Sequence, residues 1–285
     1  MIRILISASL ATSLFVVFKL FQKWNINTWQ ALLINYLTAC VLGIIYSENA
    51  EVILQSYQKP WFTSSIGLGA LFISIFYAVG KTAQTHGLSV AAITTKMSVV
   101  LPVLAGIILY NERLQAIQII GILIALISVY LSTKKDTGGL AIKSIGLPLL
   151  VFFGTGSIDT GVKWVQHHYL KEEELTLFSA HTFGVAFFVG LGTWIFQQTK
   201  KMERFEFKSI LGGVMLGIPN FFSLIWMIKM FEHTVWSSAI IFTIHNIVIV
   251  LGGTLIGALF FHEKLNRKNI YGLVLAVIAL GLMAF

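Results

Sequence analysis

The amino-acid sequence predicts an all-α membrane protein, on the basis of its composition and the length of its apolar segments. Of its 285 residues, 56% are hydrophobic and 11% are Asp, Glu, Lys or Arg, whereas about 25% charged residues are usual in a soluble protein. The apolar residues form runs of about 20, the length that crosses a hydrocarbon core about 30 Å thick. Such runs must be helical, because lipid offers no partner to a free backbone N–H or C=O group, and barrel strands would be about half as long.

Ten such segments follow one another along the chain. The first is long for a secretory signal and is followed by Lys19 and Lys23, so we interpret it as a retained helix. The gaps between segments are too short to fold as separate domains. We therefore expect helices over residues 2–21, 28–47, 61–84, 88–110, 115–132, 144–166, 175–196, 210–231, 236–261 and 268–285.

The charged residues indicate orientation rather than a charged partner. The net charge is +8, but Lys and Arg lie in the short gaps and form no basic stripe, which argues against nucleic acid as a partner. Twelve of them fall in odd-numbered loops and four in the N-terminus and even-numbered loops, so the positive-inside rule places both termini outside. Cys40 is the single cysteine, which excludes an internal disulfide and a cysteine-cluster metal site. We expect no cofactor, no bound metal, and a location in a bacterial inner (plasma) membrane.

The two halves of the sequence resemble each other. A shift of 151 residues superimposes seven identities within the 22 positions from Gly106 to Ile127. We define the repeats as residues 1–133 and 144–285, with five helices each. Because five is an odd number, the halves must have opposite orientations, as in secondary transporters whose substrate site lies near the midplane around a central cavity. The superimposed pairs are Gly106/Gly257, Glu112/Glu263, Leu114/Leu265, Ile119/Ile270, Gly121/Gly272, Ala125/Ala276 and Ile127/Ile278.

The two segments that carry this repeat resemble a known family. Residues 110–114, Tyr-Asn-Glu-Arg-Leu, and residues 261–265, Phe-His-Glu-Lys-Leu, are similar to the helix-loop-helix that closes each half of EamA-type members of the drug/metabolite transporter superfamily. The resemblance implies a ten-helix carrier whose fifth and tenth helices are peripheral. The symmetric placement of Glu112 and Glu263 at the membrane edge suggests that they hold the loops and the neighbouring helix ends. His262 departs from the family, where a Gly often precedes the Glu. The family usually has both termini in the cytoplasm, whereas the distribution of Lys and Arg places them outside. The orientation therefore stays open.

We expect the substrate site where polar side chains enter the spans, because an ionisable group there costs about 3 kcal/mol unless it is paired or faces water. Lys96 lies eight residues into the fourth span with no acidic residue one turn away, and His245 and Asn246 are adjacent in the ninth span, its counterpart. Asp159 and Lys163 have the i, i+4 spacing of a pair on one helix face. The candidates are Lys96, His245, Asn246, Asn220, Asp159, Lys163, His181 and Asn35.

Helix-breaking residues occur in the fourth and ninth spans, which carry Lys96 and His245, and also in the eighth span. Pro102 aligns at the 151 shift with Gly253, beside Gly252, so we expect both helices to be interrupted at equivalent places. Pro219, in the eighth span, precedes Asn220 and frees a carbonyl group. Interruptions at corresponding positions of two halves are typical of transporter binding sites.

The sequence therefore predicts a secondary transporter, not an enzyme. We expect a monomer or homodimer in the lipid bilayer that exports a small polar metabolite such as an amino acid by alternating access, with protons as the coupling ion through histidine. One alternative is a multidrug or organic-cation exporter, in which Asp159 would be the essential counter-ion. Another is a polytopic membrane enzyme built around the His167 patch.

Overall fold

The computed structural model describes residues 2–47, 56–110, 115–133, 142–199, 204–230 and 238–284, and these contain helices and no strands. The all-helical prediction is therefore confirmed for the described residues. The helices are α1 (Ile2–Lys23), α2 (Thr28–Tyr46), α4 (Phe62–His86), α5 (Leu88–Met97), α6 (Val100–Tyr110), α7 (Ala116–Thr133), α8 (Ile142–His168), α9 (Leu175–Gln198), α10 (Phe207–Lys229), α11 (Ser238–Phe260) and α12 (Arg267–Met283), with single 3₁₀ turns η1 (Ser56–Gln58) and η2 (Glu172–Glu174).

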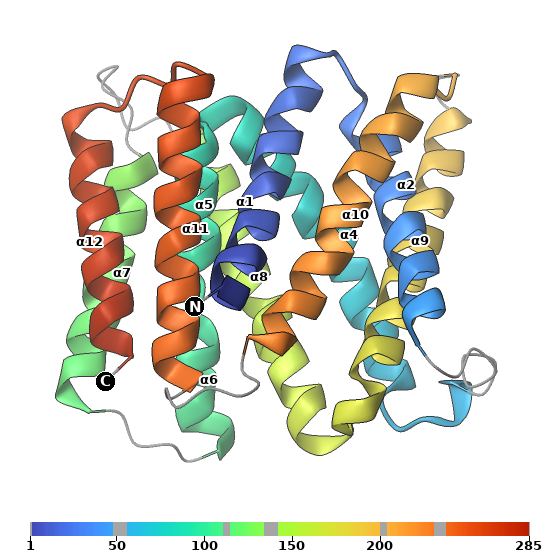
Figure 1. The fold of residues 1–285 in the computed structure, drawn as a ribbon, viewed down its shortest axis with the longest axis horizontal. Helices are drawn as coiled ribbons and strands as arrows, with labels where there is room; N and C mark the ends of the chain where they lie inside the picture. Colours follow the sequence, from blue (N-terminus) through green and yellow to red (C-terminus); the bar gives the residue numbers. More distant parts are fainter. Residues whose placement is uncertain are drawn as a thin grey trace. The chain divides into compact units, whose positions relative to one another are not determined.

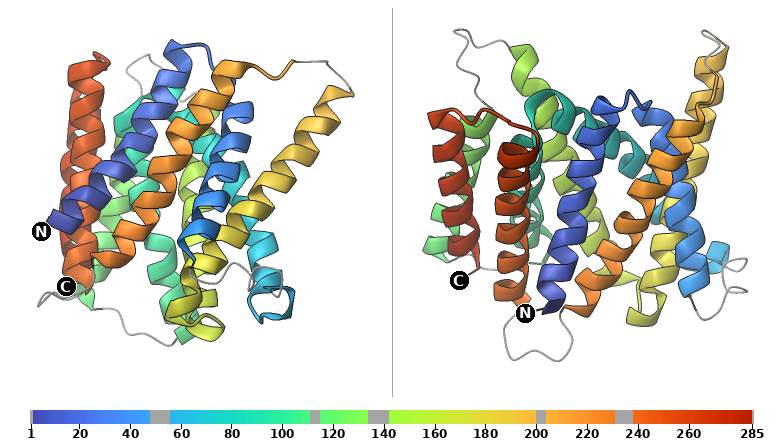
Figure 2. Two further views of the ribbon diagram at one scale, coloured as in Figure 1. Left: turned by 45° about the vertical axis from the view of Figure 1, so that its right-hand side comes forward. Right: turned by 45° about the horizontal axis from the view of Figure 1, so that its top comes forward.

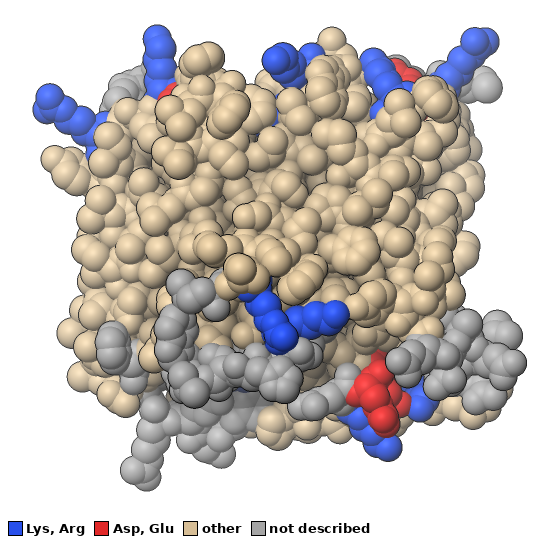
Figure 3. All heavy atoms as spheres, viewed as in Figure 1, with Lys and Arg blue, Asp and Glu red and all other residues tan. Residues whose placement is uncertain are grey.

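Nine segments of the described chain are long and apolar enough to cross a membrane, and α5 with α6 counts as one of them. The tenth predicted span corresponds to α12, which has 17 residues and is not among the nine. In Figure 3, Lys and Arg side chains lie at the top of the side formed by α11 and α12, near the start of α12 at Arg267, and the tan area directly below them shows no charged side chain. Large apolar residues of these two helices are exposed, among them Leu255, Phe260 and Val274, as expected for helices in contact with lipid.

The interruption between α5 and α6 follows from Pro102. α5 ends at Met97 and α6 begins at Val100. Proline has no N–H group, and its ring clashes with the carbonyl four residues earlier, which here belongs to Ser98. The Leu101 N–H instead donates to the Ser98 carbonyl at 2.9 Å, so the chain forms a tighter turn at the break.

The other interruptions expected from the sequence are not observed. α11 is continuous through Gly252 and Gly253, and α10 is continuous through Pro219. A Cβ on Gly253 would lie 3.1 Å from the Ala92 Cβ, so this glycine lets α5 approach α11 closely. Small residues have this role at helix contacts in membranes, and the same residue types therefore do not by themselves predict a break.

The described helices form two compact units, and the boundary between the units falls within four helices, α1, α4, α8 and α10. Unit 1 comprises Met1–Lys19, Ala78–Ser157 and Ser223–Phe285. Unit 2 comprises Leu20–Tyr77 and Ile158–Phe222.

Unit 1 is built on two helix pairs, α7 with α12 and α5 with α11. α7 and α12 lie side by side in both Figure 1 and Figure 2. Their contact is close because Gly121 and Gly272 carry no side chain: a Cβ on Gly272 would lie 2.8 Å from the Ser132 backbone nitrogen. The Ser128 hydroxyl also donates to the Gly272 carbonyl at 2.9 Å. Packing and interhelical hydrogen bonds of this kind drive helix association in lipid.

Unit 2 is centred on the pair α2 and α9. α2 begins at a defined cap, because the Asn27 side chain accepts hydrogen bonds from the backbone nitrogens of Trp29 and Gln30. Tyr36 of α2 is fully buried and has Phe76 and Phe183 as aromatic neighbours.

We predict that Gly272→Ala lowers the melting temperature of the detergent-purified protein. The added Cβ would overlap the backbone of α7, and such overpacking costs about 1–3 kcal/mol. The matched control is Gly281→Ala on the same helix, where a Cβ would have no neighbour within 4 Å; it should leave the melting temperature equal or slightly higher, because alanine favours helix more than glycine does. Equal melting temperatures for the two variants would contradict the observed close contact.

Candidate functional site

A polar cluster in unit 1 is positioned by the alignment of α1 along α11. Ile4 and Ile241 share a small apolar core, and one turn further the Ser7 hydroxyl lies 3.0 Å from Nε2 of His245. Because both helices are regular, these contacts set the register between them. The Ser7–His245 contact is therefore a consequence of packing along the helices and is fully enclosed: Ser7 is 0% and His245 2% exposed.

Nδ1 of His245 and Oδ1 of Asn246 make no hydrogen bond to any other described residue, and the Asn246 side chain interacts with the His245 ring. Both side chains are 2% exposed. A buried polar atom without a partner costs about 1–3 kcal/mol, and most such atoms in native proteins are satisfied. The pair is thus a candidate contact for a ligand.

α5 contributes the other side of the cluster. The Ser89 and Thr254 hydroxyls lie 3.0 Å apart, and Gly253 faces Ala92, so the two helices run past each other in opposite directions. Thr95 and Lys96 lie nearly two turns further along α5 than Ser89. The Lys96 charge interacts with the His245 ring, and the Thr95 hydroxyl has no hydrogen-bond partner within the described ranges. The predicted candidates Lys96, His245 and Asn246 therefore come together.

Asn35 and Asn220 form a separate polar contact in unit 2. Nδ2 of Asn220 donates to Oδ1 of Asn35 at 3.2 Å. A Cβ on Gly217 would lie 2.8 Å from the Asn35 carbonyl, so this glycine allows α10 to approach α2. Nδ2 of Asn35 and the Tyr36 hydroxyl are buried and have no hydrogen-bond partner in the described chain.

The remaining candidates occupy other surroundings. Nδ1 of His181 lies 2.8 Å from the Ser65 hydroxyl, beside the rings of Trp61 and Phe62. Asp159 and Lys163 both lie within α8, where Asp159 is exposed and Lys163 partly buried. No group of three or more His, Cys, Asp or Glu residues in the described chain could hold a metal ion.

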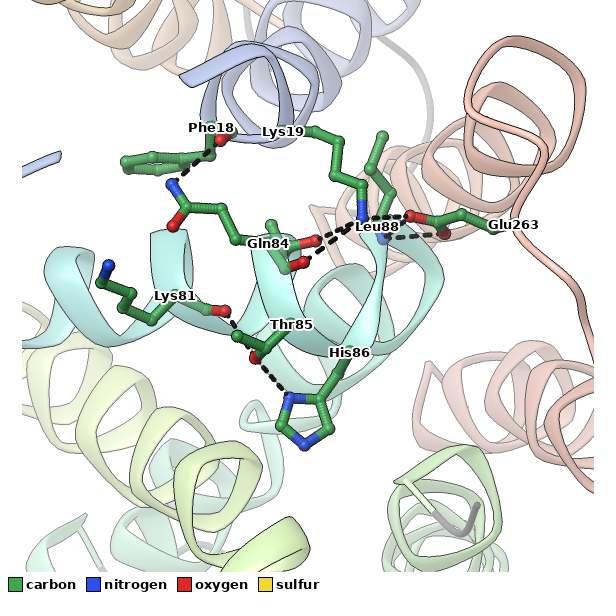
Figure 4. A network of polar contacts seen from close by, with 9 residues as sticks. Phe18, Lys19, Lys81, Gln84, Thr85, His86, Leu88 and Glu263 are labelled. Carbon is green, nitrogen blue, oxygen red and sulfur yellow. Dashed lines mark hydrogen bonds and ion pairs between the residues drawn. The ribbon is translucent and has the colours of Figure 1, made fainter. Parts of the chain in front are cut away.

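The carboxylate of Glu263 joins three helix ends of unit 1 (Figure 4). It accepts hydrogen bonds from the Leu88 N–H, at 3.0 Å to Oε1 and 2.9 Å to Oε2, and pairs with the Lys19 ammonium at 3.3 Å. Lys19 also donates to the carbonyls of Ala83 and Gln84, each at 3.4 Å. A carboxylate is favourable at the N-terminus of α5, where the helix dipole is positive. Glu263 thus connects the α11–α12 loop to the start of α5 and to α1.

Two glycines make room for this carboxylate. A Cβ on Gly87 or on Gly257 would lie 2.6 Å from Oε2 of Glu263. Gly87 also has φ of 100°, in the left-handed region that favours glycine. His262, next to Glu263, has φ of 51°, so a glycine at this position would adopt the observed backbone without strain. The other expected loop residue, Glu112, lies outside the described residues.

A second ion pair lies in unit 2, outside the membrane spans. Nζ of Lys59 lies 2.6 Å from Oε1 of Glu174, the N-cap residue of α9. Burial acts to raise the pKa of the Glu174 carboxyl, but the hydrogen bond and charge of Lys59 and the hydrogen bonds from the Lys171 backbone and the Trp61 side chain together outweigh burial, and the pKa lies below its ordinary value. This pair joins the segment before α4 to the start of α9.

The sequence did not indicate Ser7 or Gly87 as members of these networks, and it indicated Lys19 only as a polar side chain within a span. Lys19 is close to the end of its helix, which suggests a side chain that extends to the membrane surface. Gly87 follows the end of α4, as C-terminal cap glycines commonly do, and this was a usable signal. Ser7 carries none, because a serine in an apolar helix is usually bonded to its own backbone.

The comparisons with known proteins find similarity along most of the chain. No family model matches. The chain is 29% identical over 275 residues to a Haemophilus influenzae protein named "Uncharacterized protein", which covers 93% of this chain and 91% of the relative. It is 24% identical over 252 residues to the Lactococcus lactis "Putative sugar uptake protein YxfA", covering 80% of this chain and 79% of the relative.

We predict that Glu263→Ala destabilises the protein by about 1–3 kcal/mol, because it leaves the Leu88 N–H without an acceptor and the Lys19 ammonium without its counter-ion. Thermal unfolding in detergent measures this. The control is Glu206→Ala, which removes an ion pair with Lys208 whose side chains are 45% and 46% exposed. An exposed pair contributes about 0–1 kcal/mol, so a control as damaging as Glu263→Ala would contradict the structural role of Glu263.

We predict that the Lys59–Glu174 pair makes stability sensitive to acid. The Glu174 pKa is lower in the folded than in the unfolded chain, so the stabilisation is complete above the unfolded value of about 4.3 and is lost as pH falls through the folded value. Between about pH 5 and about pH 3, the wild type should lose more thermal stability than Glu174→Gln does. Glu173→Gln, which changes an exposed neighbour, should behave like the wild type.

Proposed function

We propose that this protein is a secondary transporter that moves a small polar metabolite across a bacterial plasma membrane by alternating access. The observation that carries the proposal is the unit 1 cluster, in which Lys96, Thr95, His245 and Asn246 place a charge and polar atoms inside apolar helices. Groups of this kind in a span normally contact a substrate, an ion or water. The similarity to a relative named for sugar uptake supports the same activity.

The architecture that we propose is a ten-helix fold of two inverted five-helix repeats, residues 1–133 and 144–285, as in EamA-type transporters. The contacts between helices support it, because each helix pair at the centre of a unit consists of elements equivalent under the repeat. These pairs are α7 with α12, α5 with α11, and α2 with α9. Such contacts arise when two related halves pack about a pseudo-two-fold axis in the membrane plane.

The substrate classes to test are amino acids and sugars. The sequence favours a zwitterionic or anionic metabolite, because cations outnumber anions among its buried groups, and the name of the Lactococcus relative specifies sugar uptake. The alternative is an organic-cation exporter that would use Asp159, which is exposed on α8, as its counter-ion. The direction of transport that the sequence suggests is export, with protons coupled through His245.

We predict that Lys96→Ala and His245→Ala abolish transport while the purified proteins remain folded. Counterflow of radiolabelled amino acids and sugars in proteoliposomes measures transport, and adding a pH gradient tests the coupling to protons. His168→Ala and Lys171→Ala, which change exposed residues outside the cluster, should retain wild-type counterflow. Normal transport by both cluster variants would remove α5 and α11 as the site.

A further inference from the structure

The Glu263 contacts and the polar cluster around His245 lie at different levels along α11. Glu263 lies in the non-helical segment between α11 and α12. Inward from it, the Thr254 hydroxyl of α11 lies 3.0 Å from the Ser89 hydroxyl of α5. Further inward, His245 meets Ser7 of α1. An approach to His245 from this end of α11 would therefore pass the contacts that Glu263 makes.

These contacts are made by groups that water can also bind. The Glu263 carboxylate accepts from the Leu88 N–H and pairs with the Lys19 ammonium (Figure 4). The side chains of Lys19 and Glu263 are 18% and 12% exposed, so water reaches both. Water can replace each partner at nearly equal enthalpy as the helix ends separate. The contacts are thus of a kind that can open and close reversibly.

The backbone leaves room for the Glu263 side chain to withdraw. Gly87, which separates α4 from α5, and Gly257 of α11 both face the carboxylate, and a Cβ on either would lie 2.6 Å from Oε2. No side chain at these two positions has to move when the carboxylate leaves. Glu263 is outside any helix, so its backbone can change without unwinding α11 or α12. Residues at the ends of elements commonly act as hinges in this way.

The contact between α7 and α12 in the same unit has the opposite character. Gly272 packs against the backbone of α7, where a Cβ would lie 2.8 Å from the Ser132 nitrogen. The Ser128 hydroxyl, whose residue is 0% exposed, donates to the Gly272 carbonyl. Separation of these helices would remove that donor from the Gly272 carbonyl, which is unfavourable in lipid. We therefore expect movement in unit 1 at the start of α5 rather than between α7 and α12.

We propose that the contacts of Glu263 with Lys19 and the Leu88 N–H are a gate. When they are made, the start of α5 is held beside the end of α11 and beside α1. When they break, the polar cluster around His245 becomes accessible from this end of the helices. This proposal rests on the proposed transport function, in which the site must open to one side of the membrane in each cycle, and it names the residues that open and close it.

Opening is measured by the labelling of a thiol placed just inside the gate. Cys40, the single cysteine, is first removed by Cys40→Ser, and Ser89→Cys then introduces a thiol at a position that is 3% exposed. A charged, water-soluble maleimide is applied to the detergent-purified protein. We expect Glu263→Gln to raise the labelling rate about tenfold, which corresponds to about 1.4 kcal/mol in the equilibrium between closed and open states. Lys19→Gln should do the same, whereas Lys19→Arg, which keeps the charge, should label slowly.

The matched probe is Ser128→Cys, which places a thiol between α7 and α12 at a position that is 0% exposed. Its labelling should stay slow in every variant. Glu206→Gln, which neutralises one member of an exposed ion pair in unit 2, should leave the labelling rate of Ser89→Cys unchanged. The gate is overturned if Glu263→Gln does not raise that rate. It is also overturned if the rate at Ser128→Cys rises equally, because the whole unit would then have loosened.

A covalent lock tests whether transport needs this opening. Ser89→Cys combined with Thr254→Cys places two thiols where the hydroxyls lie 3.0 Å apart, so that mild oxidation with diamide joins α5 to α11. We expect the oxidised protein to lose counterflow of amino acids and sugars, and dithiothreitol to restore it. Ser89→Cys alone should show the same counterflow with and without diamide.

The two proposals fail in different ways. Undiminished counterflow by the fully oxidised double variant would overturn the gate and leave the transport function standing. Faster labelling in Glu263→Gln, with no counterflow of any amino acid or sugar by the wild type, would reject the transport function and leave the opening of these helix ends standing.

Discussion

The attachment of the Glu263 carboxylate to the first N–H group of α5 and to Lys19 is the interaction on which unit 1 depends. It fixes one end of α1, α5 and α11 against the others. Helices are nearly rigid, with a rise of about 1.5 Å per residue, so fixing their ends also fixes which residues meet further along. The encounter of Ser7 with His245 and the approach of Lys96 follow from that register. The Glu263 contact at the helix ends and the Ser7–His245 contact further along therefore share one register between the helices.

The membrane determines how the rest of the chain packs. Lipid is as apolar as leucine, so helices associate through close contact and hydrogen bonds rather than through burial of apolar surface. Glycines at α7–α12, α5–α11 and α2–α10 provide that contact, and several face backbone carbonyls of the neighbouring helix. In such surroundings an unpartnered polar side chain is unfavourable. The polar side chains of His245, Asn246 and Thr95 therefore indicate function more strongly than they would in water.

Local patterns predicted well what depends on local physics. The apolar runs gave the positions of the helices, since only a helix satisfies its own backbone in lipid. Pro102 predicted the break before α6, because its ring clashes with a carbonyl group only four residues earlier in the same helix. The break expected at Gly252 and Gly253 is absent, because glycine allows close helix packing as readily as it interrupts a helix. Lys96, His245 and Asn246 were found as a group because charge and amide groups are rare within apolar runs.

The sequence by itself determined that this is an all-helical membrane protein, where most of its helices lie, and which few polar residues enter them. These properties follow from composition and spacing along the chain. The tertiary structure decided the partners: that Glu263 binds the start of α5, that Ser7 faces His245, and that Asn35 meets Asn220. Each of these pairs is separated by more than 170 residues. Their contact depends on the register between helices, which the packing of whole helix faces sets.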